Sequence, residues 1–187
     1  AHTMPEANSD EVSARYLNNS NVVLEKTPEA PKKFYIETYG CQMNENDTEI
    51  ISSILLKAGL SLTKDINDAN VVLLNTCAIR ENAESKVWNR LTELRSLKKK
   101  VKKEQFIIGV LGCMAERLKE KLVEKNKAVD IVVGPDAYRD LPNLIQAVEA
   151  DISDYGINVQ LSHEETYADI VPVRTNPDSH SAFLSIM

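Results

Sequence analysis

The sequence predicts an α/β fold, an open and mostly parallel sheet with helices on both faces. Short apolar runs alternate with longer stretches that have apolar residues at helical spacing, from residue 33 to residue 150. The run at residues 71–74 is apolar throughout, as is typical of a strand covered on both faces. Each of the three cysteines, Cys41, Cys77 and Cys113, stands at or just after the end of such a run. This alternation implies βαβ units with right-handed crossovers, as in flavodoxin/Rossmann-like folds.

The expected elements follow one another in a regular order. The expected strands are rich in β-branched or aromatic residues and cover 33–38, 71–75, 106–111 and 129–133, with 157–161 as an edge strand. The expected helices are amphipathic and comprise one after the first strand, then 81–97, 116–124 and 141–150. For the first helix, Asn46 or Asp47 is the candidate N-cap, and Gly59 is placed to end it in the left-handed conformation.

Composition bounds the class of protein. With 187 residues, 43% of them hydrophobic, the chain suits one domain of ordinary size with extra segments. The formal net charge of −6 gives no overall sign of nucleic-acid binding, so any such role must be local. No run of 18 apolar residues is present, and we expect no membrane partner. Three cysteines without a secretory signal favour a reducing compartment, and we expect the cytoplasm.

The three cysteines form the candidate site. Parallel strands end along one edge of a sheet, where ligands of such folds bind, so we expect the three thiols to converge. A helix is expected to start soon after each thiol, and helix N-terminal amides favour a thiolate. Gly40 and Gly112 directly precede two of the cysteines and allow a bulky group to approach the backbone.

Three thiolates without a fourth cysteine suggest an incompletely ligated metal centre. A 4Fe–4S cluster held in this way has one open iron, whereas ferredoxin-type clusters use four cysteines. Zinc on three cysteines and a water is a second option. No CxxC pair is present, so the spacing alone fits buried structural cysteines as well as it fits a metal centre.

Four ordered blocks of residues resemble the radical-SAM methylthiotransferase family. The blocks are Tyr39-Gly40-Cys41-Gln42-Met43-Asn44, Asn75-Thr76-Cys77-Ala78-Ile79-Arg80, Gly112-Cys113-Met114-Ala115-Glu116-Arg117 and Gly134-Pro135-Asp136-Ala137-Tyr138. The resemblance covers about residues 33–187. Within the family, the sequences of the first two blocks resemble those of the MiaB type, which forms 2-methylthio-N6-isopentenyladenosine in tRNA.

The resemblance implies a set of ligands and an activity. Cys41, Cys77 and Cys113 would ligate an auxiliary 4Fe–4S cluster with an open iron. The complete enzyme would also use a second 4Fe–4S cluster on a CxxxCxxC loop, together with S-adenosyl-L-methionine. It would add a methylthio group at C2 of N6-isopentenyladenosine next to the anticodon. Its partner would be tRNA carrying isopentenyladenosine. The sequence does not identify the sulfur donor, and we expect a monomer.

The CxxxCxxC spacing is absent from the 187 residues, so we expect the chain alone not to catalyse the reaction. We interpret residues 1–30 as a mobile tail that begins with a cloning scar, Ala1-His2-Thr3-Met4. Residues 31–150 would be the auxiliary-cluster domain and residues 151–180 a connecting segment. Residues 181–187 would be the first strand of a radical-SAM catalytic barrel that lies outside this sequence.

Several other residues have two interpretations each. Gln42 and Asn44 are candidates for substrate binding, although a helix-entry role for Asn44 is equally plausible from the sequence. The basic run formed by Lys98, Lys99, Lys100, Lys102 and Lys103 could bind tRNA phosphates or could be a solvated helix end. Two other classes of function compete with the enzyme: an iron–sulfur electron-transfer or binding module, and a metal-free interaction domain.

Overall fold

The computed structural model describes residues 30–77, 81–101, 106–125, 128–150, 156–158, 169–171 and 173. Within these residues, six strands form one sheet in the order β2-β1-β3-β4-β5-β6, and every neighbouring pair is parallel. The strands are β1 (Lys33–Tyr39), β2 (Ser61–Leu62), β3 (Val71–Thr76), β4 (Ile107–Gly112), β5 (Ile131–Val133) and β6 (Gly156–Asn158). The predicted parallel α/β fold is confirmed.

The chain reverses its direction of travel across the sheet at β1. It crosses from β1 to β2 on one side, and then returns to β3 on the other side of β1. This strand order is the flavodoxin-like one, and ligands of such sheets bind at the carboxyl ends of the two strands where the order reverses. A functional site is therefore expected at the carboxyl ends of β1 and β3.

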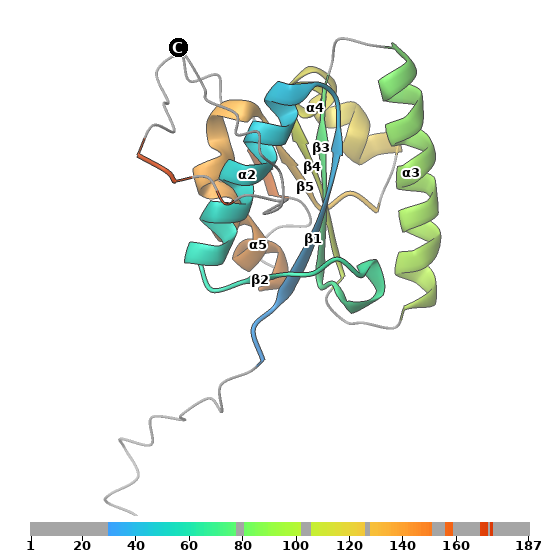
Figure 1. Cartoon of the computed structure of the whole chain (residues 1–187). Coiled ribbons are helices and arrows are strands. Elements are labelled where there is room, and N and C mark those ends of the chain that lie inside the picture. Colours follow the sequence, from blue (N-terminus) through green and yellow to red (C-terminus); the bar gives the residue numbers. More distant parts are fainter. Residues whose placement is uncertain are drawn as a thin grey trace, which may run out of the picture. The chain divides into compact units, whose positions relative to one another are not determined.

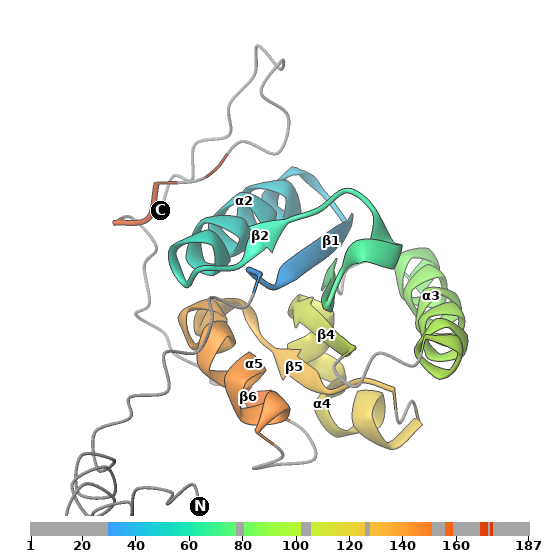
Figure 2. The ribbon, with the colours of Figure 1, turned by 90° about the horizontal axis from the view of Figure 1, so that it is seen from below.

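Helices cover both faces of the sheet. The helices are α2 (Gln42–Lys57), α3 (Glu81–Lys100), α4 (Cys113–Lys125) and α5 (Leu141–Glu149), with short 3-10 helices at Ile66–Asp68 and Pro135–Asp140. Helices α2 and α5 pack on one face, and α3 and α4 pack on the other, as Figures 1 and 2 show. None of the helices within the described residues is long and apolar enough to cross a membrane.

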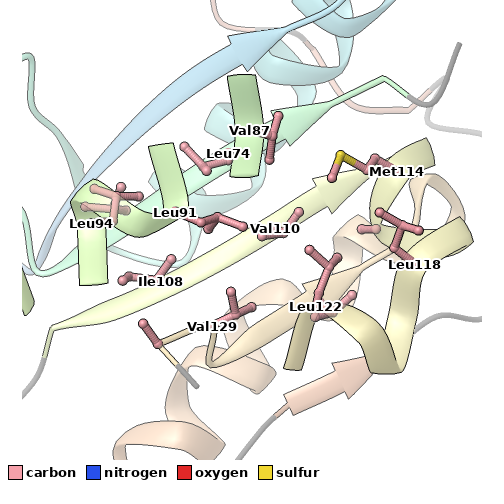
Figure 3. Close-up of a cluster of buried hydrophobic side chains, with 14 of the residues drawn as sticks. Leu74, Val87, Leu91, Leu94, Ile108, Val110, Met114, Leu118, Leu122 and Val129 are labelled. Atoms are coloured by element: carbon pink, nitrogen blue, oxygen red, sulfur yellow. The ribbon is translucent and has the colours of Figure 1, made fainter. Parts of the chain in front are cut away.

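Alternate residues of the central strands supply two separate cores. Figure 3 shows the core under α3 and α4, where Leu74 and Val110 of the sheet meet Leu91 of α3 and Leu122 of α4. Leu73, the residue before Leu74 in β3, points to the opposite face and belongs to a second cluster with α2 and α5. Both faces of β3 are buried, which explains why its sequence is continuously apolar up to Leu74.

Two helix starts differ from the sequence prediction. Helix α2 begins at Gln42 with Cys41 as its N-cap, so the prediction of Asn46 or Asp47 as N-cap is wrong. Helix α4 begins at Cys113 itself, three residues earlier than expected. In both cases the strand leads almost directly into the helix. Apolar periodicity marks only the part of a helix that faces the core, so it does not reveal a first turn at the edge of the sheet.

Other boundaries agree with the prediction or were missed. Gly59 has a φ of 93° just after α2, so its predicted left-handed conformation is confirmed. The two-residue strand β2 and the 3-10 helix Pro135–Asp140 were not predicted, because they are too short to show a period. The expected edge strand is present as β6, although residues 159–161 lie outside the described residues.

A short segment after β6 lies along the α2 face. Asp169 pairs with Arg139, Ile170 is buried, and the amide of Val173 donates to the carbonyl of Glu49 over 3.4 Å. The expected tail 1–30, most of the expected connecting segment and the expected strand 181–187 lie outside the described residues, and the division into domains stays a prediction.

We expect Leu91→Ala to lower the free energy of unfolding by about 2–5 kcal/mol, because it opens a cavity in the core under α3. Leu62→Ala is the matched control, because Leu62 is 39% exposed on the edge strand and should cost less than about 1 kcal/mol. Urea denaturation measures both values, and a loss for Leu91→Ala no larger than that for Leu62→Ala would contradict the packing described.

Candidate metal centre

The three cysteines lie at the carboxyl ends of three neighbouring strands. Tyr39 of β1 is in register with Thr76 of β3, and Thr76 is in register with Gly112 of β4. Cys77 and Cys113 each follow one residue after these partners, and Cys41 follows two residues after Tyr39. Residues that are 36 positions apart in the sequence are thus brought to one edge of the sheet, beside the β1/β3 switch point.

The three thiols differ in exposure. Cys77 is buried, with 8% of its surface exposed, whereas Cys41 and Cys113 are exposed. Cys41 is the N-cap of α2 and Cys113 is the first residue of α4, so two of the three lie at helix N-termini. All three are free cysteines. The arrangement has one inner thiol and two outer thiols that a bound group could reach from solvent.

Two glycines keep the backbone open between the thiols. A Cβ atom added to Gly40 would lie 2.8 Å from the Cβ of Cys77 and 2.2 Å from Oδ1 of Asn44. Gly112 has a φ of +92°, and a Cβ atom there would lie 2.3 Å from the carbonyl oxygen of Thr76. Any side chain at either position would push the strand ends apart, so the glycines set how closely the cysteines approach one another.

A buried polar network lies next to Cys41 and Cys77. The side chain of Asn75, at 0% exposure, donates to the carbonyl of Asn44 over 2.7 Å and to Oγ1 of Thr48 over 2.9 Å. Asn44, 5% exposed, donates to the carbonyl of Thr76 over 3.3 Å. The amide of Cys41 in turn donates to Oδ1 of Asn44 over 3.2 Å. These bonds join the first turn of α2 to the end of β3.

Electrostatics favour a neutral thiol at Cys113 in the absence of a bound cation. Burial raises the pKa of the Cys113 thiol, and the nearby Cys77 raises it further, with smaller contributions from Asp47 and Glu116. The expectation that a helix N-terminus favours a thiolate is therefore outweighed at this position. Binding a metal group here would require release of the proton, because only the thiolate is a ligand.

A carboxylic acid lies on the first half of α2 near this edge. Burial raises the pKa of Asp47, although a hydrogen bond of 3.1 Å from the hydroxyl of Tyr138 partly opposes the shift. Asp47 and Tyr138 join α2 to the 3-10 helix that precedes α5. The pair stabilises the packing of the two elements that cover one side of the thiol edge.

The donor set suits an iron–sulfur cluster in its chemistry, because cysteine thiolates are the usual ligands of such clusters. Among the described residues, no group of three histidine, cysteine, aspartate or glutamate side chains lies close enough to hold one metal ion. A cubane cluster binds its thiolates at separate corners, so its ligands stand further apart than ligands that share one ion. Three cysteines from three adjacent strand ends can supply such separate ligands, and glycines directly precede two of them.

The other predicted site residues fall in different places. Gln42 is exposed at the first residue of α2, next to Cys41, and its role in substrate binding stays a prediction. Asn44 has the helix-entry geometry, because it accepts a hydrogen bond from the N-cap residue. Asn75 was not predicted as a site residue. The signal was available, because Asn75 is a large polar side chain near the end of an otherwise apolar strand.

Fold and site together define a class of protein: a flavodoxin-like α/β domain with three cysteines at the strand ends around its switch point. The family model described as "Uncharacterized protein family UPF0004" matches residues 33–134, more than half of the chain, and the chain therefore belongs to that family.

Curated relatives confirm the resemblance found in the sequence. The tRNA-2-methylthio-N(6)-dimethylallyladenosine synthase of Chloroherpeton thalassium is 57% identical over 155 residues, which cover 83% of this chain and 33% of that protein. The synthase of the same name from Bacteroides thetaiotaomicron is 53% identical over 161 residues, covering 86% of this chain and 34% of that protein.

A third relative comes from a eukaryote. The mitochondrial tRNA methylthiotransferase CDK5RAP1 of Homo sapiens is 53% identical over 158 residues, which cover 83% of this chain and 26% of that protein. The chain thus spans between about a quarter and a third of the length of these relatives.

We expect Gly112→Ala to destabilise the chain more than Gly59→Ala, although both glycines have positive φ angles. A Cβ atom at Gly59 meets nothing within 4 Å, whereas one at Gly112 meets the Thr76 carbonyl. Gly59→Ala should therefore show the backbone strain alone, about 1–3 kcal/mol, and Gly112→Ala that strain plus a clash. Urea denaturation compares them, and equal losses would argue against close contact at Gly112.

We expect Asp47→Asn to raise the free energy of unfolding at pH 7. The folded-state pKa of Asp47 lies above its ordinary value of 3.8, so the native state favours the protonated acid. That favourable contribution is complete below pH 3.8 and is lost as the pH rises through the folded-state pKa. The gain from Asp47→Asn should therefore be present at pH 7 and absent at low pH, as measured by denaturation at both values. An equal gain at both pH values would contradict the shift.

Proposed function

We propose that this chain forms the auxiliary-cluster domain of a tRNA methylthiotransferase. The observation that supports the proposal most directly is the placement of Cys41, Cys77 and Cys113 at three adjacent strand ends, around the switch point where such folds bind ligands. The names of the relatives supply the chemistry, since they are called methylthiotransferases or 2-methylthio-dimethylallyladenosine synthases. The complete protein would add a methylthio group at C2 of N6-isopentenyladenosine in tRNA.

Within this domain, the three thiolates would hold a 4Fe–4S cluster. When bound, such a cluster would supply an iron without a protein thiolate, at which a sulfur atom can be held near the substrate. The chain itself would provide the fixed spacing of the ligands. Cys77 would hold the group from inside the sheet edge, while Cys41 and Cys113 would hold it from two helix N-termini. Gly40 and Gly112 would leave the backbone close to the bound group.

Substrate would approach from the exposed side of this edge. Gln42 follows Cys41 directly and is exposed, so its amide could contact the base or the transferred sulfur. The neighbouring Met43 is 77% exposed and offers an apolar surface on the same turn of α2. In the complete protein, a second 4Fe–4S cluster and S-adenosyl-L-methionine would come from outside these 187 residues.

The basic run of α3 lies far from the thiol edge. Helix α3 has 20 residues and runs back along the sheet, so it is roughly 30 Å long and its last turn lies at the end away from the thiol edge. Lys98 is paired with Asp130 at 2.6 Å, which gives it a structural role, whereas Lys99 and Lys100 are exposed. Lys102 and Lys103 lie outside the described residues. Any contact of Lys99 and Lys100 with tRNA phosphates would be remote from the modified base.

The compartment and assembly state are also part of the proposal. We retain the cytoplasm as the expected compartment, on the basis of the free cysteines and the reducing conditions that they favour. The monomeric state stays an expectation. A relative with a mitochondrial name shows that homologous sequences also occur in another compartment.

We expect Cys77→Ala to reduce the iron and sulfide content of the chain, reconstituted without oxygen, to a small fraction of the wild-type value. The substitution would remove the inner ligand. Because Cys77 is small and buried, alanine should fit in its place without disrupting the fold. Leu62→Ala is the control and should leave the content unchanged. In the full-length protein, Cys77→Ala should abolish formation of 2-methylthio-N6-isopentenyladenosine, measured by mass spectrometry of tRNA nucleosides. Full iron and sulfide content in the variant would refute the proposal.

A further inference from the structure

Two buried asparagines connect the helix that begins after Cys41 with the strand that ends before Cys77. Asn44 lies in the first turn of α2, and Asn75 lies in β3, two residues before Cys77. Their exposed fractions are 5% and 0%, so neither side chain is available to solvent. A polar amide is costly to bury unless its donors and acceptors are paired, and both of these amides are engaged.

The bonds between the two segments are reciprocal. The Asn75 side chain donates to the main-chain carbonyl of Asn44 over 2.7 Å, and the Asn44 side chain donates to the main-chain carbonyl of Thr76 over 3.3 Å. Each asparagine therefore holds the backbone of the other segment. An aspartate could not make the same bonds, because an ionised carboxylate has no donor.

The same network reaches the cysteines. Oδ1 of Asn44 accepts from the amide of Cys41 over 3.2 Å and lies 3.6 Å from its Sγ. On the other side, the hydroxyl of Thr76 donates to the carbonyl of Leu111 over 2.7 Å, which ties the end of β3 to the end of β4. The positions of all three cysteines therefore depend on side chains that are not themselves ligands.

We propose that Asn44 and Asn75 form a positioning pair that holds Cys41 beside Cys77 before any cluster enters. The role of this pair in cluster binding rests on the proposed function, but the positioning of the two cysteines does not require a bound group. Preformed spacing spares the chain the cost of ordering its ligands when the cluster binds. Asn75 is the more important member, because its side chain donates both to the carbonyl of Asn44 and to Oγ1 of Thr48, and its removal would break both bonds between β3 and α2.

The first test measures the distance between the two thiols without metal. In a metal-free Cys113→Ala chain, only Cys41 and Cys77 remain, and dibromobimane becomes fluorescent when it joins two thiols that lie close together. We expect Asn75→Ala to slow this cross-linking about tenfold, the factor that corresponds to the loss of two buried hydrogen bonds. The second test uses the chain with all three cysteines after reconstitution with iron and sulfide. Loss of iron to a chelator should be faster in Asn75→Ala by a similar factor.

Ser52→Ala is the matched control. Ser52 is 0% exposed on the same helix and donates to the carbonyl of Thr48 over 2.7 Å, so the substitution removes a buried hydrogen bond away from the cysteines. It should leave cross-linking and iron release within about twofold of the wild-type values. If Asn75→Ala fails to fold by circular dichroism, Asn44→Ser takes its place. It removes the Asn44 donor to Thr76 and to Oδ1 of Asn75 and the acceptor for Cys41, and it leaves both bonds donated by Asn75.

Each outcome is decisive. Slower cross-linking in a folded asparagine variant, with normal behaviour of Ser52→Ala, supports the positioning pair. Unchanged cross-linking, or an equal effect of Ser52→Ala, overturns it. If the wild-type chain binds no iron and cross-linking still depends on Asn75, the cluster proposal fails and the positioning of the thiols stands.

Discussion

The register of three parallel strands is the constraint on which the site depends. Because β1, β3 and β4 end level with one another, each residue that follows a strand is placed beside its counterpart on the next strand. A shift of one residue would turn each strand's buried side chains toward the opposite face. Both faces of β3 and β4 are buried, so the close packing of the two different cores opposes such a shift. The cores under the helices therefore also fix where the cysteines stand.

Much of this arrangement was predictable from the sequence. The alternation of apolar runs and amphipathic stretches predicted the parallel sheet. The position of each cysteine after an apolar run predicted that the three thiols lie at one edge of that sheet. The helix starts at Cys41 and Cys113 were not predictable in this way, because first turns at the sheet edge carry no apolar period. The role of Asn75 needed the structure, since its partners Asn44 and Thr48 are about 30 positions away and belong to another element.

The site combines features that stabilise the fold with features that cost stability. The asparagine network satisfies its buried polar groups, whereas Asp47 is buried enough to have a raised pKa and Gly112 is held at a positive φ. The crowding at Gly112 also leaves no room for a side chain. Local costs of this kind persist when the surrounding structure holds them in place, and they gather at functional sites. Here they gather around the ends of β3 and β4, where the thiols lie.

The common direction of the helices gives the domain two electrically different ends. Helices α2 and α4 both start at the thiol edge, and the acidic residues Glu45 and Glu116 occupy their first turns. The opposite ends carry Lys57 and the lysines of α3. In the field of a polyanion, such a charge separation produces a torque that turns the lysine end inward and the thiol end outward. Contacts other than these lysines are therefore needed to hold a polyanion at the thiol edge.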